Sequence, residues 1–291
     1  MRSLGVAVVM SIAWSVAVVN GATFTVTSTA DSGVGTLRQA IIDANDNPGE
    51  DRIEFAIPEG ECSAAGVCTI DLLTAPEAID EAVVVDGTTQ PRYGTAPANV
   101  CATASAPSYM RVEILGDPEG FFSLYTFLIV SEDPSTIRGL ALSRKYPIAL
   151  YSSGAHRVEC THLGVSADGS SKVSTSTGIS IGQSGQGAIV GVDGDGVDDL
   201  AERNVIAAST GVYINGNWNN VVAGNYVGLG ADGVTSLGSA LGVYIRQGSR
   251  DNLIGTNEDN VSDDLERNVI ANTSTGINID SVAGSGDGNL V

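Results

Sequence analysis

Lysine is almost absent from this chain: Lys145 and Lys172 are the only two among 291 residues. Lysine and arginine together number 14, against 34 aspartates and glutamates, and the formal net charge is −20. Nucleic-acid affinity comes chiefly from cationic side chains that displace counterions from phosphates, and anionic lipids repel an acidic surface. The composition therefore predicts that neither nucleic acids nor anionic membranes are partners.

Soft metal ligands are scarce as well. Histidine occurs only twice, and no two cysteines are separated by two residues, so a structural zinc site is disfavoured. Four cysteines in a chain that carries export signals predict a disulfide framework, for which three pairings are open. We expect one local and one long-range bridge, Cys62–Cys68 and Cys101–Cys160.

Long apolar runs are missing after the first twenty residues, so no membrane insertion is expected for the rest of the chain. The one run, Leu4 to Val19, follows Arg2 and is closed by small residues. It is short for a spanning helix, which needs about 20 residues. It predicts a secretory signal peptide over residues 1–21, cleaved after Gly21. An uncleaved anchor helix is the alternative.

An internal repeat dominates what is present. Residues 159–214 recur without a gap as residues 223–278, and the run Glu202–Ala207 is repeated identically as Glu266–Ala271. An offset of 64 residues that holds through so many Gly, Asn and apolar positions indicates stacked copies of one structural unit. The chain is therefore predicted to be a solenoid.

The 64-residue unit contains two coils. A motif of glycine, aliphatic, variable and aliphatic residues recurs every 31 to 34 residues, at 178–181, 211–214, 242–245 and 276–279, with Ile148–Leu150 as a preceding copy. Each coil holds three short β-branched strands separated by Gly and Asn, and helical periodicity is absent. This pattern predicts an all-β parallel β-helix. Its loops 191–202 and 255–266, and the loops 164–176 and 228–240, should project from fixed corners.

Asparagines recur at the starts of these strands. A structural role is expected for them, because Asn accepts the left-handed backbone angle and can bond to an identical side chain in the next coil. The set is Asn204, Asn220, Asn225, Asn252 and Asn268.

The N-terminal part, residues 22–50, reads as a strand and a capping helix. Thr23–Thr27 alternate as a strand should, and Thr36 followed by Gln39 fits a capping box. Leu37, Ile41 and Ala44 would share one face of the helix, which could cover the open end of the first coil. The β-helix is expected to fill residues 51–291, with its clearest repeats in 148–291 and a loop at 92–110.

Several of these motifs resemble those of a known protein family. Gly35–Ala40 is similar to the Cys-Ser-Leu-Arg-Glu-Ala motif, and Asp86–Pro91 and the Asn-Val-Val and Arg-Asn-Val-Ile repeats are similar to those of secreted bacterial right-handed parallel β-helix repeat proteins. The resemblance implies a right-handed solenoid, export, and a secreted or cell-surface location. Members often continue into further repeats and a sorting segment, so the chain is expected to be truncated after Val291. Most have no assigned reaction.

One outer strand face is the candidate binding site. Side chains alternate along a strand, so residues between the inward aliphatics point outward and stack about 4.8 Å apart from coil to coil. They predict a column for extracellular polysaccharide or cell-surface components, formed by Tyr213, Tyr244, Arg246, Asn278 and Asp280. The alternative is that the two tyrosines are only a cross-strand aromatic pair.

The loop 191–202 is the candidate cofactor site. Four carboxylates separated by glycines could wrap one calcium ion, and they are Asp193, Asp195, Asp198 and Asp199. The alternative is a solvated acidic hairpin, because the copy in the second loop replaces two of the carboxylates.

The sequence contains no recognisable catalytic motif. A polysaccharide lyase or glycoside hydrolase of the pectin-degrading β-helix type is the rival function, and such enzymes need an arginine or lysine base or paired carboxylates. Arg246 and Asp280 are the only charged pair placed on the outer face, and His156 and His162 are expected to face solvent at strand ends. The prediction therefore leans toward adhesion, polysaccharide binding or a surface scaffold, and away from an enzyme.

Overall fold

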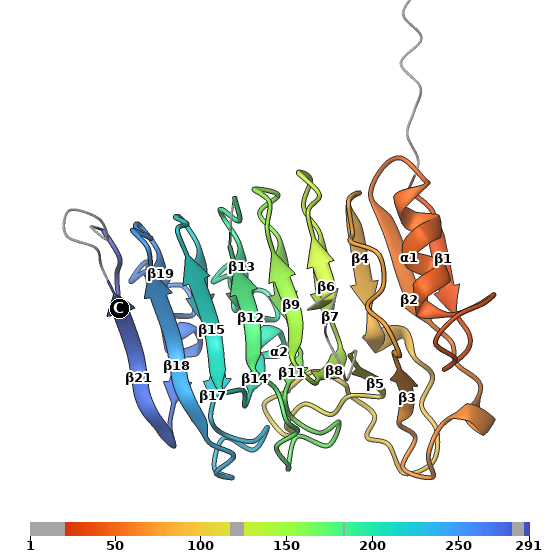
Figure 1. Cartoon of the computed structure of the whole chain (residues 1–291). Coiled ribbons are helices and arrows are strands. Elements are labelled where there is room, and N and C mark those ends of the chain that lie inside the picture. Colours follow the sequence, from red (N-terminus) through yellow and green to blue (C-terminus); the bar gives the residue numbers. More distant parts are fainter. Residues whose placement is uncertain (1–20, 117–124, 183, 281–287) are drawn as a thin grey trace, which may run out of the picture.

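The computed structural model describes residues 21–116, 125–182, 184–280 and 288–291, and it is a right-handed parallel β-helix (Figure 1). The predicted signal peptide falls almost entirely outside these residues. Every pair of named strands is parallel, and the strands stack along the solenoid into three sheets of eight, seven and six strands. No helix in the described part of the chain is long and apolar enough to cross a bilayer.

The three sheets are named A, B and C. Sheet A contains β1 (Thr23–Val26), β2 (Asp51–Phe55), β4 (Val83–Asp86), β7 (Thr136–Arg138), β10 (Arg157–Glu159), β13 (Ile189–Gly191), β16 (Val221–Ala223) and β19 (Leu253–Ile254). Sheet B contains β3 (Cys68–Asp71), β5 (Val112–Leu115), β8 (Leu140–Ser143), β11 (His162–Leu163), β14 (Val205–Ile206), β17 (Tyr226–Val227) and β20 (Val269–Ile270). Sheet C contains β6 (Tyr125–Ile129), β9 (Tyr146–Leu150), β12 (Thr177–Ile181), β15 (Thr210–Asn215), β18 (Ser239–Arg246) and β21 (Thr273–Asp280).

From β4 onward the chain visits sheets A, B and C in turn, one coil after another. The predicted glycine-aliphatic motifs lie in sheet C, where Ile148 pairs with Ile179, Ile179 with Val212, and Val212 with Val243. The predicted second and third strands of each coil lie in sheets A and B. The acidic loops therefore form the corner between sheets A and B, and the loops 164–176 and 228–240 form the corner between sheets B and C.

One continuous aliphatic core fills the tube. From β6 to β18 the inward residues of the sheet C strands, such as Ile179 and Ile181 in β12 or Val212 and Ile214 in β15, are fully buried. Burying such a side chain contributes about 1.5–3 kcal/mol. The spacing of two between inward residues is what holds the register, because a shift of one residue would turn every aliphatic side chain to solvent.

The N-terminal helix α1 (Leu37–Asn45) forms as predicted and closes the core at the first coil (Figure 1). Its buried face, with Leu37 and Ile41, belongs to the same apolar cluster as Ile53 of β2. The hydroxyl of Thr36 caps the helix by accepting a hydrogen bond from the backbone N–H of Gln39 at 3.3 Å. Only half of the capping box forms, because the Gln39 amide donates to Asp43 instead.

Both predicted disulfides are present. Cys62–Cys68 closes a local loop with Cα atoms 4.1 Å apart, and Cys101–Cys160 joins residues 59 apart in the sequence, with Cα atoms 5.4 Å apart. Cys101 belongs to the predicted loop 92–110, whereas Cys160 lies between β10 and β11. The second bridge therefore ties this loop to the solenoid.

The asparagines form two ladders, in which Asn204, Asn220, Asn225 and Asn252 are buried and Asn268 is partly buried. Asn204 Nδ2 donates to Asn225 Oδ1 at 2.9 Å, and Asn225 Nδ2 donates to Asn268 Oδ1 at 3.0 Å. In the second ladder Asn220 Nδ2 donates to Asn252 Oδ1 at 2.9 Å. The predicted side-chain pairing between coils is therefore confirmed. The predicted left-handed backbone is wrong for these five residues, because the positive φ falls on neighbours such as Asn219, at 60°.

Two further helical turns, α2 (Asp199–Glu202) and α3 (Asp263–Glu266), end the acidic loops, and single 3₁₀ turns lie at η1 (Glu59–Glu61) and η2 (Gly87–Thr89). The helices α2 and α3 occupy equivalent places in the two copies of the 64-residue unit and contact one another. The two acidic loops are therefore stacked at one corner of the solenoid.

Candidate functional site

Two tyrosines lie in register on the outer face of sheet C. Val212 and Ile214 of β15 are fully buried, so Tyr213 between them points away from the core and is only half-buried. Its partner in the next coil is Tyr244 of β18. The two ring centroids are 5.5 Å apart, with planes inclined by 43°. Adjacent rings of this kind form an apolar platform, and such a pair contributes about 0.5–1.5 kcal/mol.

Polar side chains surround this pair. The register places Asn278 beside Tyr244 and Asp280 beside Arg246. The guanidinium carbon of Arg246 lies 5.8 Å from the centroid of the Tyr244 ring, and the Tyr244 hydroxyl donates to Oδ2 of Asp280 at 3.4 Å. The structure therefore brings all five predicted ligand-binding residues, Tyr213 included, onto one surface. That surface combines aromatic faces with an amide, a cation and a carboxylate.

A second group of tyrosines on sheet C was not predicted. The ring of Tyr125 lies 5.6 Å from that of Tyr146 and 5.5 Å from that of Tyr151. Burial raises the pKa of Tyr125, and the hydrogen bond to the Tyr151 hydroxyl raises it further. The side chain of Tyr125 is also hydrogen-bonded to the side chain of Ser180, which opposes the rise. Ser180 in turn pairs with Tyr213, so the two aromatic groups are adjacent. The available sequence signal was that two of these tyrosines flank the aliphatic triplet of the preceding coil.

The first acidic loop brings together only two of its four predicted calcium ligands. Carboxylate oxygens of Asp193, Asp199 and Glu202 lie within 4.8 Å of one another, and they form the one such group among the described residues. Asp195 caps its own turn through Oδ1, and Asp198 precedes α2 with a left-handed φ of 60°. Glu202 joins the group because residues three apart share one face of a helical turn.

An arginine already neutralises part of this group. Arg157 Nη1 lies 2.7 Å from Oδ2 of Asp193, and its Nη2 lies 2.9 Å from Oε1 of Glu202. Burial, together with the nearby charges of Asp193 and Glu159, raises the pKa of Glu202 to about 7, although the hydrogen bond from the Asp193 backbone N–H and the charge of Arg157 oppose the rise. Burial opposes the charged form of Arg157, but its bond to Asp193 and the surrounding carboxylates raise its pKa overall. Arg157 is therefore a fixed cation and unsuited to act as the base of a lyase.

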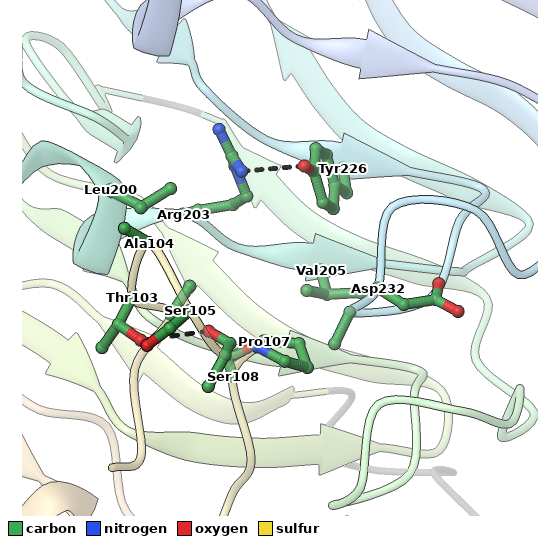
Figure 2. Close-up of a pocket in the computed structure, with 13 residues that line it drawn as sticks. Thr103, Ala104, Ser105, Pro107, Ser108, Leu200, Arg203, Val205, Tyr226 and Asp232 are labelled. Carbon is green, nitrogen blue, oxygen red and sulfur yellow. Dashed lines mark hydrogen bonds between the residues drawn. The ribbon is translucent and has the colours of Figure 1, made fainter.

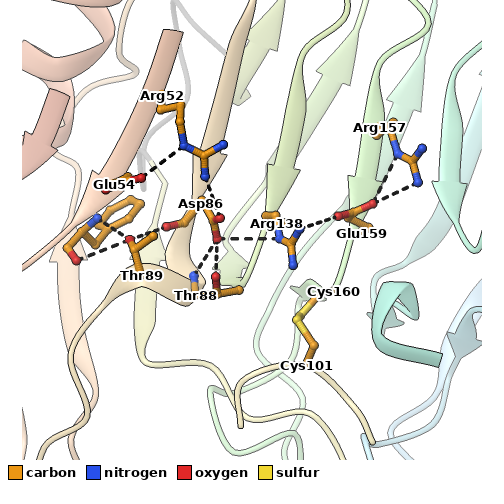
Figure 3. Close-up of polar contacts among 11 residues, drawn as sticks. Arg52, Glu54, Asp86, Thr88, Thr89, Cys101, Arg138, Arg157, Glu159 and Cys160 are labelled. Atoms are coloured by element: carbon orange, nitrogen blue, oxygen red, sulfur yellow. Dashed lines mark hydrogen bonds and ion pairs between the residues drawn. A yellow bond between two sulfur atoms is a disulfide. The ribbon is translucent and has the colours of Figure 1, made fainter. Parts of the chain in front are cut away.

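The same arginine ends a row of alternating charges on the outer face of sheet A (Figure 3). Arg52 lies 3.2 Å from Asp86, Asp86 lies 3.7 Å from Arg138, Arg138 lies 3.2 Å from Glu159, and Glu159 lies 3.3 Å from Arg157. Arg52 lies in β2, Asp86 in β4 and Arg138 in β7, and Glu159 and Arg157 both lie in β10. The row therefore links four neighbouring strands of sheet A. The two carboxylates of the row are buried, and each is shared by two partly exposed arginines. The row leads directly to the acidic loop.

A pocket of about 290 Å³ lies over sheet B, between α2 and the loop 102–108 (Figure 2). Arg203 and Tyr226 line one side, where Arg203 Nη1 donates to the Tyr226 hydroxyl at 2.9 Å and its guanidinium carbon lies 4.2 Å from the ring centroid. Asp232 lines another side. Ligand pockets usually have about 300–1,000 Å³, and both large side chains here are already paired. The pocket was not predicted, because it depends on the path of a loop distant in sequence.

The predicted solvent-facing position of both histidines is wrong. His156 and His162 are fully buried. His162 Nε2 lies 2.8 Å from the hydroxyl of Ser108, and His156 Nε2 lies 2.9 Å from that of Ser152. Burial lowers the pKa of each imidazole to about 4. His162 is buried because the loop 92–110, which supplies Ser108, lies over the outer face of sheet B.

Three outer faces thus offer different chemistry: an aromatic platform on sheet C, a charge row on sheet A that ends in a carboxylate group, and a small pocket on sheet B. Comparison with known proteins adds no assignment to any of them. No protein-family model matches this chain, and no curated protein matches it significantly.

Proposed function

We propose that this chain is an exported or cell-surface β-helix protein that binds a neutral extracellular polysaccharide along the outer face of sheet C, in adhesion or as part of a surface scaffold. The observation that carries the proposal is the Tyr213–Tyr244 pair, with its rings 5.5 Å apart on consecutive strands. Sugar rings present flat apolar faces edged with hydroxyl groups, and stacked aromatic side chains flanked by polar groups match both features.

The surrounding residues fit a hydroxyl-rich ligand. Arg246 offers donors, Asp280 offers acceptors, and Asn278 offers both, and all three lie beside the aromatic pair in the register of β18 and β21. The second aromatic group, with Tyr125 and Tyr151, lengthens the platform along the solenoid axis. A linear polymer that runs along this axis would meet one coil after another.

The charge of the chain favours a neutral polymer. A formal net charge of −20 repels polyuronates and sulfated glycans over distances of about a Debye length, roughly 8–10 Å at physiological ionic strength. Export is supported by the two disulfides, because such bonds persist in oxidising compartments outside the cytosol.

The test is affinity electrophoresis of the purified chain in gels that contain neutral or acidic polysaccharides. We expect a neutral polysaccharide to retard the chain. Tyr213→Ala combined with Tyr244→Ala should weaken the affinity by about tenfold or more, since 1.4 kcal/mol corresponds to a factor of ten. Tyr226→Ala is the matched control, because this tyrosine is also half-buried but lies on sheet B.

Two results would contradict the proposal. One is a failure of every neutral polysaccharide to retard the wild-type chain, and the other is unchanged retardation of the double variant. New reducing ends or unsaturated products after incubation with polysaccharide and calcium would instead favour the rival function, a lyase or hydrolase.

A further inference from the structure

We propose that Asp193, Asp199 and Glu202 together bind one calcium ion at the corner between sheets A and B. The proposal does not depend on polysaccharide binding. Its first support is Asp199, whose side chain is 3 % exposed and has neither carboxylate oxygen in a hydrogen bond with any described residue. A buried carboxylate without a partner costs several kcal/mol, so its presence calls for a compensating positive charge.

The second copy of the loop shows what a compensated carboxylate looks like. Asp263 is the equivalent of Asp199, and its Oδ1 accepts a hydrogen bond from the hydroxyl of Thr256 at 3.1 Å. The residue in the place of Thr256 in the first loop is Val192, which has no hydroxyl and is fully buried. The first loop therefore keeps the carboxylate but lacks the donor that satisfies it in the second.

The charges around Asp199 remain unbalanced. Arg157 is shared by three carboxylates, those of Asp193, Glu202 and Glu159. Arg157 is the last cation of the charge row on sheet A. Beyond it lie three carboxylates, those of Asp193, Glu202 and Asp199. A divalent cation would neutralise this surplus at the point where the carboxylates converge.

The donor set selects the kind of ion. All three side chains offer oxygen, which suits hard cations, and they offer none of the nitrogen or sulfur ligands that zinc or copper prefer. Their oxygens lie within 4.8 Å of one another. Two oxygens on opposite sides of a calcium ion, each at about 2.3–2.6 Å, are about 5 Å apart, whereas the shorter bonds of magnesium require a tighter group. Backbone carbonyls and water can complete the calcium shell.

The experiment is a titration of the chelator-treated full chain with calcium chloride by isothermal calorimetry, with melting temperatures measured with and without the ion. We expect saturable binding at one site and a higher melting temperature with calcium, because a ligand of the folded state stabilises it. Asp199→Asn should lower the calcium affinity by more than about tenfold. Without calcium this variant should be at least as stable as the wild type, since it removes an uncompensated charge.

The second loop supplies the matched control. Asp263→Asn should leave the calcium affinity unchanged, because Asp263 belongs to no such carboxylate group among the described residues. Val192→Thr, which copies Thr256, should raise the melting temperature of the metal-free chain and weaken calcium binding. Absence of saturable binding by the wild type would overturn the site, as would equal calcium affinity of the wild type and Asp199→Asn. A response to magnesium as strong as that to calcium would overturn the choice of ion.

Discussion

The two copies of the repeat, 159–214 and 223–278, have the same core but different surroundings. Their strands pair in parallel register in all three sheets. Outside the core, Cys160 of the first copy corresponds to Gly224 of the second, and His162 corresponds to Tyr226. His162 is fully buried under the loop 92–110, whereas Tyr226 is half-buried at the edge of a pocket.

The difference teaches where this solenoid can vary. Inward positions are held by packing, because any change of volume there is felt throughout the coil. Outward positions depend on what covers them: the first copy is covered and tied by the Cys101–Cys160 bridge, and the second is open. The candidate platform on sheet C lies mostly on the open copy. Three variants test this contrast, from the largest expected effect to the smallest.

The largest effect is expected from the bridge that distinguishes the copies. Cys101→Ser combined with Cys160→Ser should lower the free energy of unfolding by about 4 kcal/mol, because a bridge across 59 residues restricts the unfolded chain strongly. Urea unfolding followed by circular dichroism measures the loss. The matched control is Cys62→Ser with Cys68→Ser, which opens a separation of only 6 residues and should cost about 2 kcal/mol. Equal losses would show that loop closure is not the cause.

A smaller effect is expected from the pH dependence of the covered histidine. His162 titrates near 6.5 in an unfolded chain, and burial lowers its pKa to about 4 in the folded protein. Between these values the unfolded chain binds more protons, so stability is lost as the pH falls from about 6.5 to 4. From pH 7 to pH 5 the wild type should lose about 2 kcal/mol more than His162→Gln, as measured by urea unfolding at each pH.

His156 provides the internal reference for that comparison. Burial lowers its pKa to about 4 as well, so it contributes the same slope to the wild type and to His162→Gln. Identical pH slopes of the two proteins would mean that the imidazole of His162 is not buried in its neutral form.

The smallest effect on stability is expected at the open copy. Gly182 of the first copy corresponds to Arg246 of the second, so the fold does not require a large side chain there. Arg246→Ala should change the free energy of unfolding by less than about 1 kcal/mol while weakening polysaccharide binding several-fold in affinity electrophoresis. A loss of stability well above that value would make Arg246 a structural residue of the platform.

Much of the fold could be predicted because its signals are periodic. The recurrence of Ile179, Val212, Val243 and Ile277 locates one strand in each coil, and alternation along the strands then places Tyr213 outside. The platform on sheet C followed from these two regularities alone. The tyrosines of the preceding coil escaped prediction because Tyr125 lies at the start of its strand, outside the repeated motif.

The acidic loop shows the opposite case. Spacing along the chain predicts Asp195 and Asp198 as ligands. Instead, Asp195 Oδ1 accepts a hydrogen bond from the backbone N–H of Val197, and Asp198 is the residue that precedes α2. Glu202 replaces them because α2 turns its carboxylate back toward Asp193, whose backbone N–H donates to Glu202 Oε2 at 2.9 Å. Irregular loops follow contacts made in three dimensions, and residue spacing does not encode those contacts.

The amino-acid sequence by itself determined the tube: which residues fill it, how many strands form each coil, and which side chains face water. These are local consequences of a period of two along each strand and of about 32 residues between coils. Only the tertiary structure decided what covers those outward residues, such as the loop over His162 and the helical turn that carries Glu202 to Asp193. The reason is physical: alternation is imposed by the backbone, whereas the path of a loop is chosen by distant partners.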